Sequence, residues 1–165
     1  MTRRGQALVE FALVASIMFV IVFAIVDFGF LFASRVNANA ATRIAARYAA
    51  THPTAWTNAA TPAAGTIEGK LNQTPVQPKV PNDDAHITIN YYVPGSAGAT
   101  LCGAYSVTSN SFVAQSGYTQ ATCVKAGNLV RVTVTQSYPL LTSLLGGLFG
   151  TSVSVSGTAA MPVMT

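Results

Sequence analysis

The sequence predicts an α+β fold in which a long N-terminal helix packs on a small antiparallel β-sheet. Two observations predict it. The stretch from Ala7 to Ser34 is strongly apolar and holds sixteen consecutive uncharged residues, from Phe11 to Val26. Further along, apolar and polar residues alternate with the period of a β-strand in three stretches: Ala85–Val93, Leu129–Tyr138 and Thr151–Met161.

The first element is a basic leader of residues 1–5, followed by a membrane-spanning helix over residues 6–34. As a helix, Ala7 to Ser34 would be ~42 Å long, against a hydrocarbon core of ~30 Å, so one pass is expected. Arginines flank the segment on both sides, so the charges do not orient it. Export of the remaining chain is instead indicated by its cysteines and its Thr- and Ser-rich strands.

Two carboxylates stand in or beside this apolar segment. Glu10 lies near its start, and an acid at mid-depth in a membrane would cost about 2.5–3.5 kcal/mol. We therefore expect a positive charge to compensate Glu10 in an assembly, or its solvation among lipid headgroups. Asp27 lies ~25 Å further along the helix, near the opposite interface, where it is either solvated with Arg35 nearby or contacts another subunit.

Residues 35–52 are predicted to continue the helix outside the membrane, until His52-Pro53 ends it. An apolar stripe at every fourth position is expected to pack this helix on its own sheet, with subunit contact as the alternative. Residues 53–84 form a connector, with a short helix from Thr66, as its cap, to Leu71. The stripe consists of Val36, Ala40, Ile44 and Tyr48.

Residues 85–165 are predicted to form a small β-rich domain, with the three alternating strands as a meander. Pro94–Lys125 would be a long excursion between the first two strands, and it contains Cys102 and Cys123. An even number of cysteines in an exported domain favours a disulfide, with two buried free thiols as the alternative. A later apolar group would cover the core or contact the membrane or a partner: Leu144, Leu145, Leu148 and Phe149.

The composition argues against several function classes. Nine Lys and Arg face five Asp and Glu, a net charge of +4, and no basic cluster interleaves with aromatics, so no nucleic-acid partner is expected. His52 and His86 have no metal partners by spacing, and no hydrolase, nucleotide-binding or zinc-protease motif occurs. We expect neither an enzyme nor a cofactor.

The N-terminal residues resemble a known family. Residues 4–11, RGQALVEF, resemble the processing site of type IV pilin-like proteins, in particular the TadE-like pseudopilins of tight-adherence (Flp-type) pilus systems. Residues 25–29, IVDFG, and the Ala-rich residues 39–50 extend the resemblance. Family members often have Arg where this chain has Phe30.

The resemblance implies a function in assembly. A prepilin peptidase would cut after Gly5, so that Gln6 becomes the new amino terminus and Glu10 the fifth mature residue. In related pilins this acid pairs with the amino terminus of a neighbouring subunit. Phe11 stands where major pilins usually have Tyr, and the chain is longer than they are. The resemblance therefore implies a minor subunit in the cell membrane, with other pilin-like subunits and the inner-membrane assembly platform as partners.

A different class of function remains open from the sequence. The first segment could be a plain anchor for an exported binding domain, or a secretory signal cleaved after Ala38-Asn39-Ala40. The apolar stretch is longer than the usual 7–15 residues of such a signal, and Asp27 interrupts it. The site of processing distinguishes these alternatives.

Overall fold

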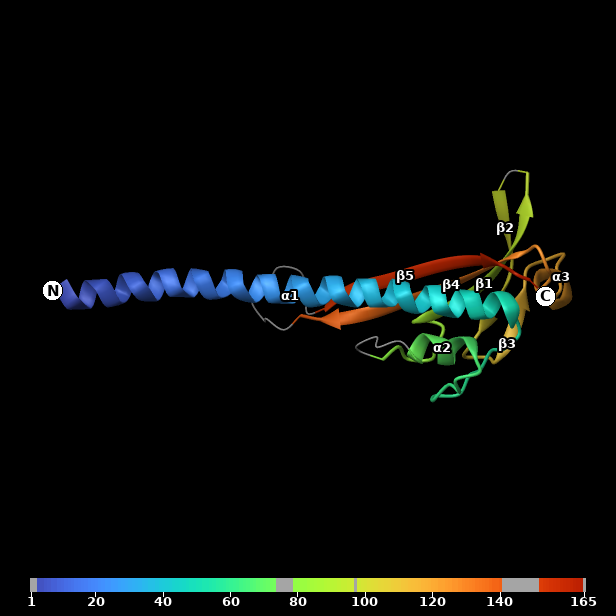
Figure 1. The fold of residues 1–165 in the computed structure, drawn as a ribbon, viewed down its shortest axis with the longest axis horizontal. Helices are drawn as coiled ribbons and strands as arrows, with labels where there is room; N and C mark the ends of the chain where they lie inside the picture. Colours follow the sequence, from blue (N-terminus) through green and yellow to red (C-terminus); the bar gives the residue numbers. More distant parts are fainter. Residues whose placement is uncertain (1–2, 74–78, 97, 141–151, 165) are drawn as a thin grey trace. The chain divides into compact units, whose positions relative to one another are not determined.

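The computed structural model describes residues 3–73, 79–96, 98–140 and 152–164. The chain divides into two compact units. One unit consists of residues 1–33 with 137–153, and the other, here called the body, consists of residues 34–136 with 154–165. The predicted α+β class is confirmed, since one long helix and a five-stranded antiparallel sheet dominate the structure (Figure 1).

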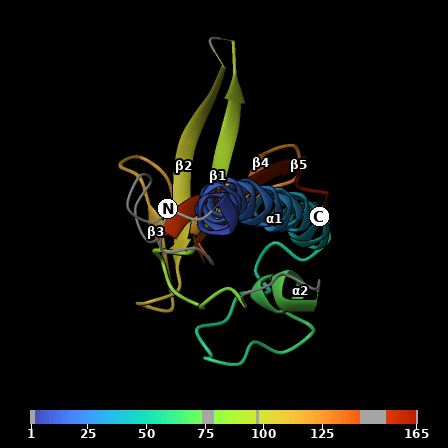
Figure 2. The ribbon, with the colours of Figure 1, turned by 90° about the vertical axis from the view of Figure 1, so that its left-hand side faces the viewer.

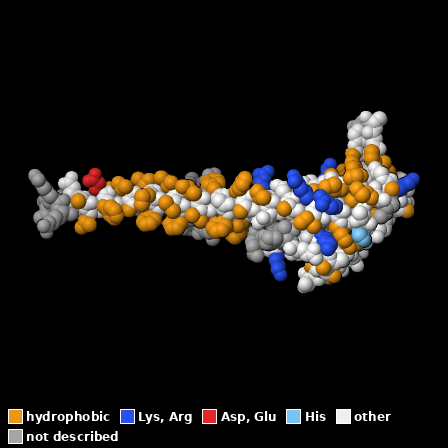
Figure 3. Space-filling view, viewed as in Figure 1, with side chains coloured by type: hydrophobic (Ala, Val, Ile, Leu, Met, Phe, Trp, Pro, Cys, Tyr) orange, Lys and Arg blue, Asp and Glu red, His pale blue; other side chains and the backbone are white. Residues whose placement is uncertain are grey.

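The long helix, α1, spans Arg3–Thr51 without a break. It ends where His52-Pro53 was expected to end it, and it begins before Gly5, so the predicted boundary between leader and membrane segment lies inside the helix. From Leu8 to Phe32, all large apolar side chains except Leu31 are exposed, by 39% to 72%. In Figure 3 these side chains form an almost continuous apolar surface. Such a surface needs a non-aqueous environment or a partner.

By length and composition, α1 is suited to crossing a membrane. Its mean hydropathy reaches 2.8 over its most apolar window, and it is the one helix of this kind in the part of the chain that the structure describes. The window is not buried by other parts of the protein. Together with the exposed side chains, this agrees with a single-pass anchor.

The sheet has the strand order β3-β2-β1-β4-β5 (Figure 1). The three predicted strands are confirmed as β1 (Ile87–Gly95), β4 (Leu129–Pro139) and β5 (Ser152–Pro162). β1 and β4 are direct antiparallel neighbours, with Ile89 opposite Val132. Their inward residues alternate with outward ones, as the period of two requires.

The predicted excursion Pro94–Lys125 does connect β1 to β4 and contains the disulfide, but its strands were not predicted. This stretch forms β2 (Gly98–Ser106), β3 (Ser111–Ala114) and a short helix, α3 (Gln120–Cys123). β2 returns along β1 as a hairpin that projects from the sheet (Figure 2). Most of its residues are small, and its buried positions do not alternate regularly with exposed ones. The hairpin partner and the sheet, rather than local propensity, make it a strand.

The body's core lies between the second half of α1 and the sheet. On the helix it is lined by six alanines, all at most 1% exposed: Ala38, Ala41, Ala45, Ala46, Ala49 and Ala50. These short side chains allow close approach. A Cβ added at Gly157 of β5 would lie 2.7 Å from backbone atoms of Ala38.

The predicted core stripe on this helix is therefore wrong. Val36 and Ile44 are 51% and 47% exposed, and Ala40 and Tyr48 are only half-buried. The large residues of the helix face outward because the alanine face meets the sheet, and bulkier side chains would hold the two apart.

The connector contains the predicted short helix as α2, Ile67–Gln73. Thr66 is its cap, because its Oγ1 accepts a hydrogen bond from the Gly69 N–H at 3.1 Å. At the far end of the chain, the Met164 N–H donates to the Ala50 carbonyl at 2.8 Å and holds the C-terminal residues to α1. The predicted apolar group at 144–149 lies outside the described residues.

Candidate functional site

The residues of the predicted processing site lie in the first turns of α1. Gly5, Gln6, Glu10 and Phe11 are all exposed, and Phe11 is 72% exposed. A Cβ added at Gly5 would meet nothing within 4 Å, so no part of the described chain covers this peptide bond. The first turns of α1 are thus not covered by any other described part of the chain.

Helical geometry sets Gln6 and Glu10 one turn apart. Residues at i and i+4 share a helix face, with Cβ atoms ~5–6 Å apart. Side chains on a helix lean toward its N-terminus, so the carboxylate of Glu10 leans toward position 6. An amino group created at Gln6 would lie within reach of this acid or of the same acid in a neighbouring helix.

Asp27, the other carboxylate of this segment, is not on the open surface. Its side chain is 2% exposed and has an interaction partner within the chain. Its predicted contact with another subunit stays a prediction. Sequence reasoning placed the residue correctly on α1 but gave no sign that the chain itself would bury it.

Comparison with protein families identifies the segment that carries these residues. Residues 5–47 match the family model described as TadE-like protein. This segment is TadE-like. The match includes Gly5, Glu10 and Asp27, and confirms the resemblance predicted from the sequence. Comparisons with curated proteins and with solved structures give no match.

The TadE-like segment extends beyond the apolar stretch into the helix that packs on the sheet. Its Ala-rich end supplies Ala41, Ala45 and Ala46 to the core, all fully buried. Thr42 is also buried and donates to the Ala38 carbonyl at 3.0 Å, so its hydroxyl is satisfied within the helix. The family resemblance here therefore coincides with a structural role: these small residues let the body's sheet reach α1.

The two cysteines form the predicted disulfide. Cys102 lies on β2 and Cys123 at the end of α3, with Cα atoms 5.5 Å apart. Both residues are fully buried. The bond holds α3 against the sheet, and Asn128 adds to it by donating to the carbonyls of Thr122 and Cys123 at 2.8 Å.

A buried carboxyl group was missed by sequence reasoning. Glu68 of α2 is 0% exposed. Its Oε2 accepts a hydrogen bond from the Thr57 N–H at 3.2 Å, while Oε1 has no partner among the described residues. Burial raises the pKa of Glu68 to about 7, although hydrogen bonds from its own and the Thr57 backbone lower it. A single Glu in a polar connector gives no sequence signal of burial.

Glu68 lies near an aromatic cluster that closes one end of the core. Trp56 stacks on Tyr105 with ring centroids 4.9 Å apart and contacts Tyr91 edge-on. The Trp56 Nε1–H donates to the Tyr91 hydroxyl at 3.1 Å, and that hydroxyl donates to the Pro53 carbonyl at 2.5 Å. Burial, together with the nearby charges of Glu68 and Asp84, raises the pKa of Tyr105 to about 12. The Tyr105 hydroxyl donates to Asn110 Oδ1 at 2.7 Å, so both tyrosine hydroxyls of the cluster form hydrogen bonds within the body.

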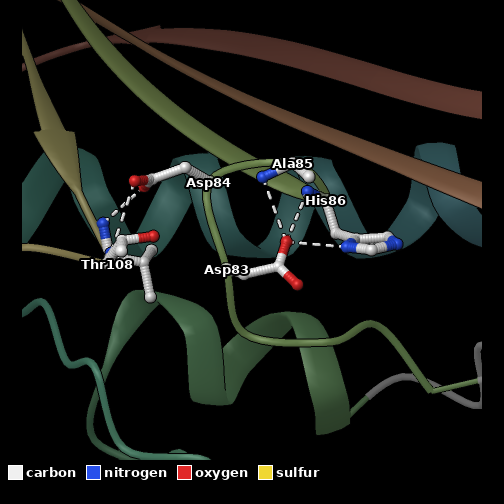
Figure 4. Close-up of polar contacts among 6 residues, drawn as sticks. Asp83, Asp84, Ala85, His86 and Thr108 are labelled. Atoms are coloured by element: carbon white, nitrogen blue, oxygen red, sulfur yellow. Dashed lines mark hydrogen bonds and ion pairs between the residues drawn. The ribbon is translucent and has the colours of Figure 1, made fainter.

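The carboxylates of Asp83 and Asp84 accept hydrogen bonds around the turn before β1 (Figure 4). Asp83 accepts from His86 Nδ1–H at 2.6 Å and from the His86 N–H at 2.9 Å, and the side-chain hydrogen bond lowers its pKa. Asp84 accepts from the Ser106 hydroxyl at 2.7 Å and the Val107 N–H at 2.6 Å. Both carboxylates are thus used inside the body.

Within the described ranges, no group of three or more His, Cys, Asp or Glu side chains could hold a metal ion.

Proposed function

We propose that the protein is a minor pseudopilin of an Flp-type pilus or a related secretion system, processed after Gly5 by a prepilin peptidase. The observation that carries this proposal is the TadE-like match over residues 5–47, because it contains the glycine and the acid at the required spacing. The exposure of Gly5 supports it, since the peptidase needs access to the backbone.

Processing would create a positive charge that can compensate the carboxylate of Glu10. Cleavage frees the α-amino group of Gln6, which is positive in part at neutral pH. A carboxylate removed from water is best compensated when a partner supplies the opposite charge with good geometry. Pairing of Glu10 with the amino terminus of a neighbouring subunit would fix the register of the two helices.

The body would lie on the exported side of the cell membrane. The disulfide supports this placement, because such bonds persist in oxidising compartments. Partners would then be other pilin-like subunits and the inner-membrane assembly platform. The packing of Ala38 against Gly157 argues against release after Ala40, because cleavage there would remove part of the helix that lines the core.

The first test is the intact mass and amino-terminal sequence of the protein from native membranes. A start at Gln6 supports the proposal, and Gly5→Leu should abolish this start. A start at Ala41 would instead indicate a secreted domain, and an uncut chain a plain anchored one.

The second test is Glu10→Ala. We expect loss of pilus assembly, with membrane insertion and processing retained, because the carboxylate that sets the register is gone. Val9→Ala, at a neighbouring exposed position, is the matched control and should assemble normally. Normal pili in the Glu10→Ala strain would contradict the assigned role.

A further inference from the structure

The outward face of α1 beyond residue 34 combines apolar and cationic side chains. Val36 and Ile44 are about half exposed, and Arg43 and Arg47 are exposed beside them. Positions 36, 40 and 44 form one row at i+4 spacing, and positions 43 and 47 belong to the adjacent row. We call this surface, with Lys70 of α2, the outer face. In Figure 3, Lys and Arg side chains gather over this part of the body.

An open groove of about 450 Å³ lies at one end of the outer face. It contains two cations and no acid, and its lining is Ile44, Arg47, Tyr48, Thr51, Lys70 and Gln73. The groove is preformed. The Tyr48 hydroxyl donates to the Gly65 carbonyl at 2.8 Å, while Lys70 Nζ lies 5.1 Å from the Tyr48 ring centroid and donates to Gln73 Oε1 at 3.3 Å.

Within the described part of the body, no acid lies in this face. Among the described residues, Arg43 and Arg47 form no ion pair with a carboxylate. The body holds seven Lys and Arg but three acidic side chains. Of these acids, Glu68 is buried, and Asp83 and Asp84 are hydrogen-bonded within the body. A second body docked here would therefore offer the arginines no carboxylate that is not already hydrogen-bonded or buried.

Lipid headgroups are also a poor match for the groove. If the membrane segment ends near Ser34, Ile44 lies ~15 Å further along the helix. The headgroup layer is only ~5–7 Å thick on each side of the bilayer. The groove would thus lie beyond it, on the part of the helix that faces water or protein.

We infer that the outer face binds an acidic amphipathic helix of a different subunit. This inference rests on the proposed function and names the chemistry of one partner. The exposed Val36 and Ile44 would pack against an apolar row of that helix, and Arg43, Arg47 and Lys70 would pair with its carboxylates. Like charge across the same face would reject a second copy, so the surface makes the contact heterotypic.

The test uses the full chain in phosphatidylcholine nanodiscs and a labelled helical peptide with one row of Leu and an adjacent row of Glu. A matched peptide has Lys in place of every Glu. By fluorescence anisotropy, we expect the Glu peptide to bind about tenfold tighter than the Lys peptide, or more. Arg43→Glu/Arg47→Glu should reverse this preference. Equal binding of both peptides, or none, would overturn the inference.

A control variant distinguishes an effect of the outer face from an effect of the body's net charge. Lys79→Glu/Lys125→Glu changes the body's charge by the same amount at exposed positions outside the face and should alter binding by less than about twofold. Equal weakening by both double variants would reduce the effect to net charge and refute the site. Peptide binding is measured without cleavage after Gly5. A negative binding result would therefore refute the inference about the outer face without bearing on the proposed function.

Self-association is tested by cysteine cross-linking in the same nanodiscs. Ile44→Cys should dimerise no faster than Val113→Cys, which is similarly exposed on β3. Faster dimerisation through position 44 would show that a second copy occupies the outer face.

Discussion

Replacing Glu68 with Gln should stabilise the protein at neutral and alkaline pH. The side chain is fully buried, and only one of its oxygens has a hydrogen-bond partner among the described residues. Gln has nearly the same shape and keeps one oxygen for the Thr57 N–H. Unlike Glu, Gln stays uncharged at every pH, so the substitution removes the cost of burying a carboxylate.

The magnitude follows from the pKa of Glu68, which burial raises from 4.5 to about 7. At about 1.4 kcal/mol per pKa unit, the difference corresponds to about 3 kcal/mol. Since the folded state holds the proton more tightly than the unfolded state, the contribution of Glu68 to stability is highest below pH 4.5. It falls as the pH rises to about 7, and is constant above that value. The Gln variant lacks this decline.

Unfolding of the full chain in detergent micelles by urea, followed by Trp56 fluorescence, measures the effect. Trp56 is the single tryptophan and belongs to the aromatic cluster near Glu68. The two proteins should be similarly stable at pH 4.5 and differ by about 3 kcal/mol at pH 8. Asp83→Asn is the control with the opposite sign, because the pKa of Asp83 is lowered. Identical pH dependence of wild type and Glu68→Gln would refute the argument.

Two further predictions concern packing and the disulfide. Gly157→Ala should lower the free energy of unfolding by about 1–3 kcal/mol, because its Cβ would lie 2.7 Å from the Ala38 backbone. Gly65→Ala, where a Cβ meets nothing within 4 Å, is the matched control, and equal melting temperatures for both would contradict the close contact. Cys102→Ser/Cys123→Ser should cost about 3 kcal/mol, since the bond closes a loop of about 22 residues. An unchanged urea midpoint under oxidising conditions would show that the bond adds no stability.

Much of the fold could be predicted because its strongest signals are local. The apolar run of α1, its end at His52-Pro53 and the alternation in β1, β4 and β5 each appear within one short window of sequence. β2 and β3 could not be found in this way. β3 is only four residues long, and the buried positions of β2 do not alternate regularly. β2 becomes a strand by pairing with β1, and β3 by pairing with β2.

The orientation of the second half of α1 was mispredicted for a different reason. Size and hydrophobicity favoured Val36 and Ile44 as core residues, whereas the sheet packs on alanines that allow the backbones to approach. Of the candidate site, Gly5 and Glu10 were identified from their spacing and lie in the family match. Burial of Glu68 and of Asp27 depends on tertiary packing and leaves no pattern in the sequence.

The bond between Cys102 and Cys123 also limits how far the chain can be stretched. If force pulls the body apart from its two ends, the 21 residue steps between the half-cystines cannot lengthen. At ~3.3–3.6 Å per extended residue, this withholds ~70 Å of contour length. The second half of β2, all of β3 and α3 lie within this closed ring, so tension bypasses them through the disulfide. Oxidation thus fixes the maximum extension of the subunit as well as the position of α3.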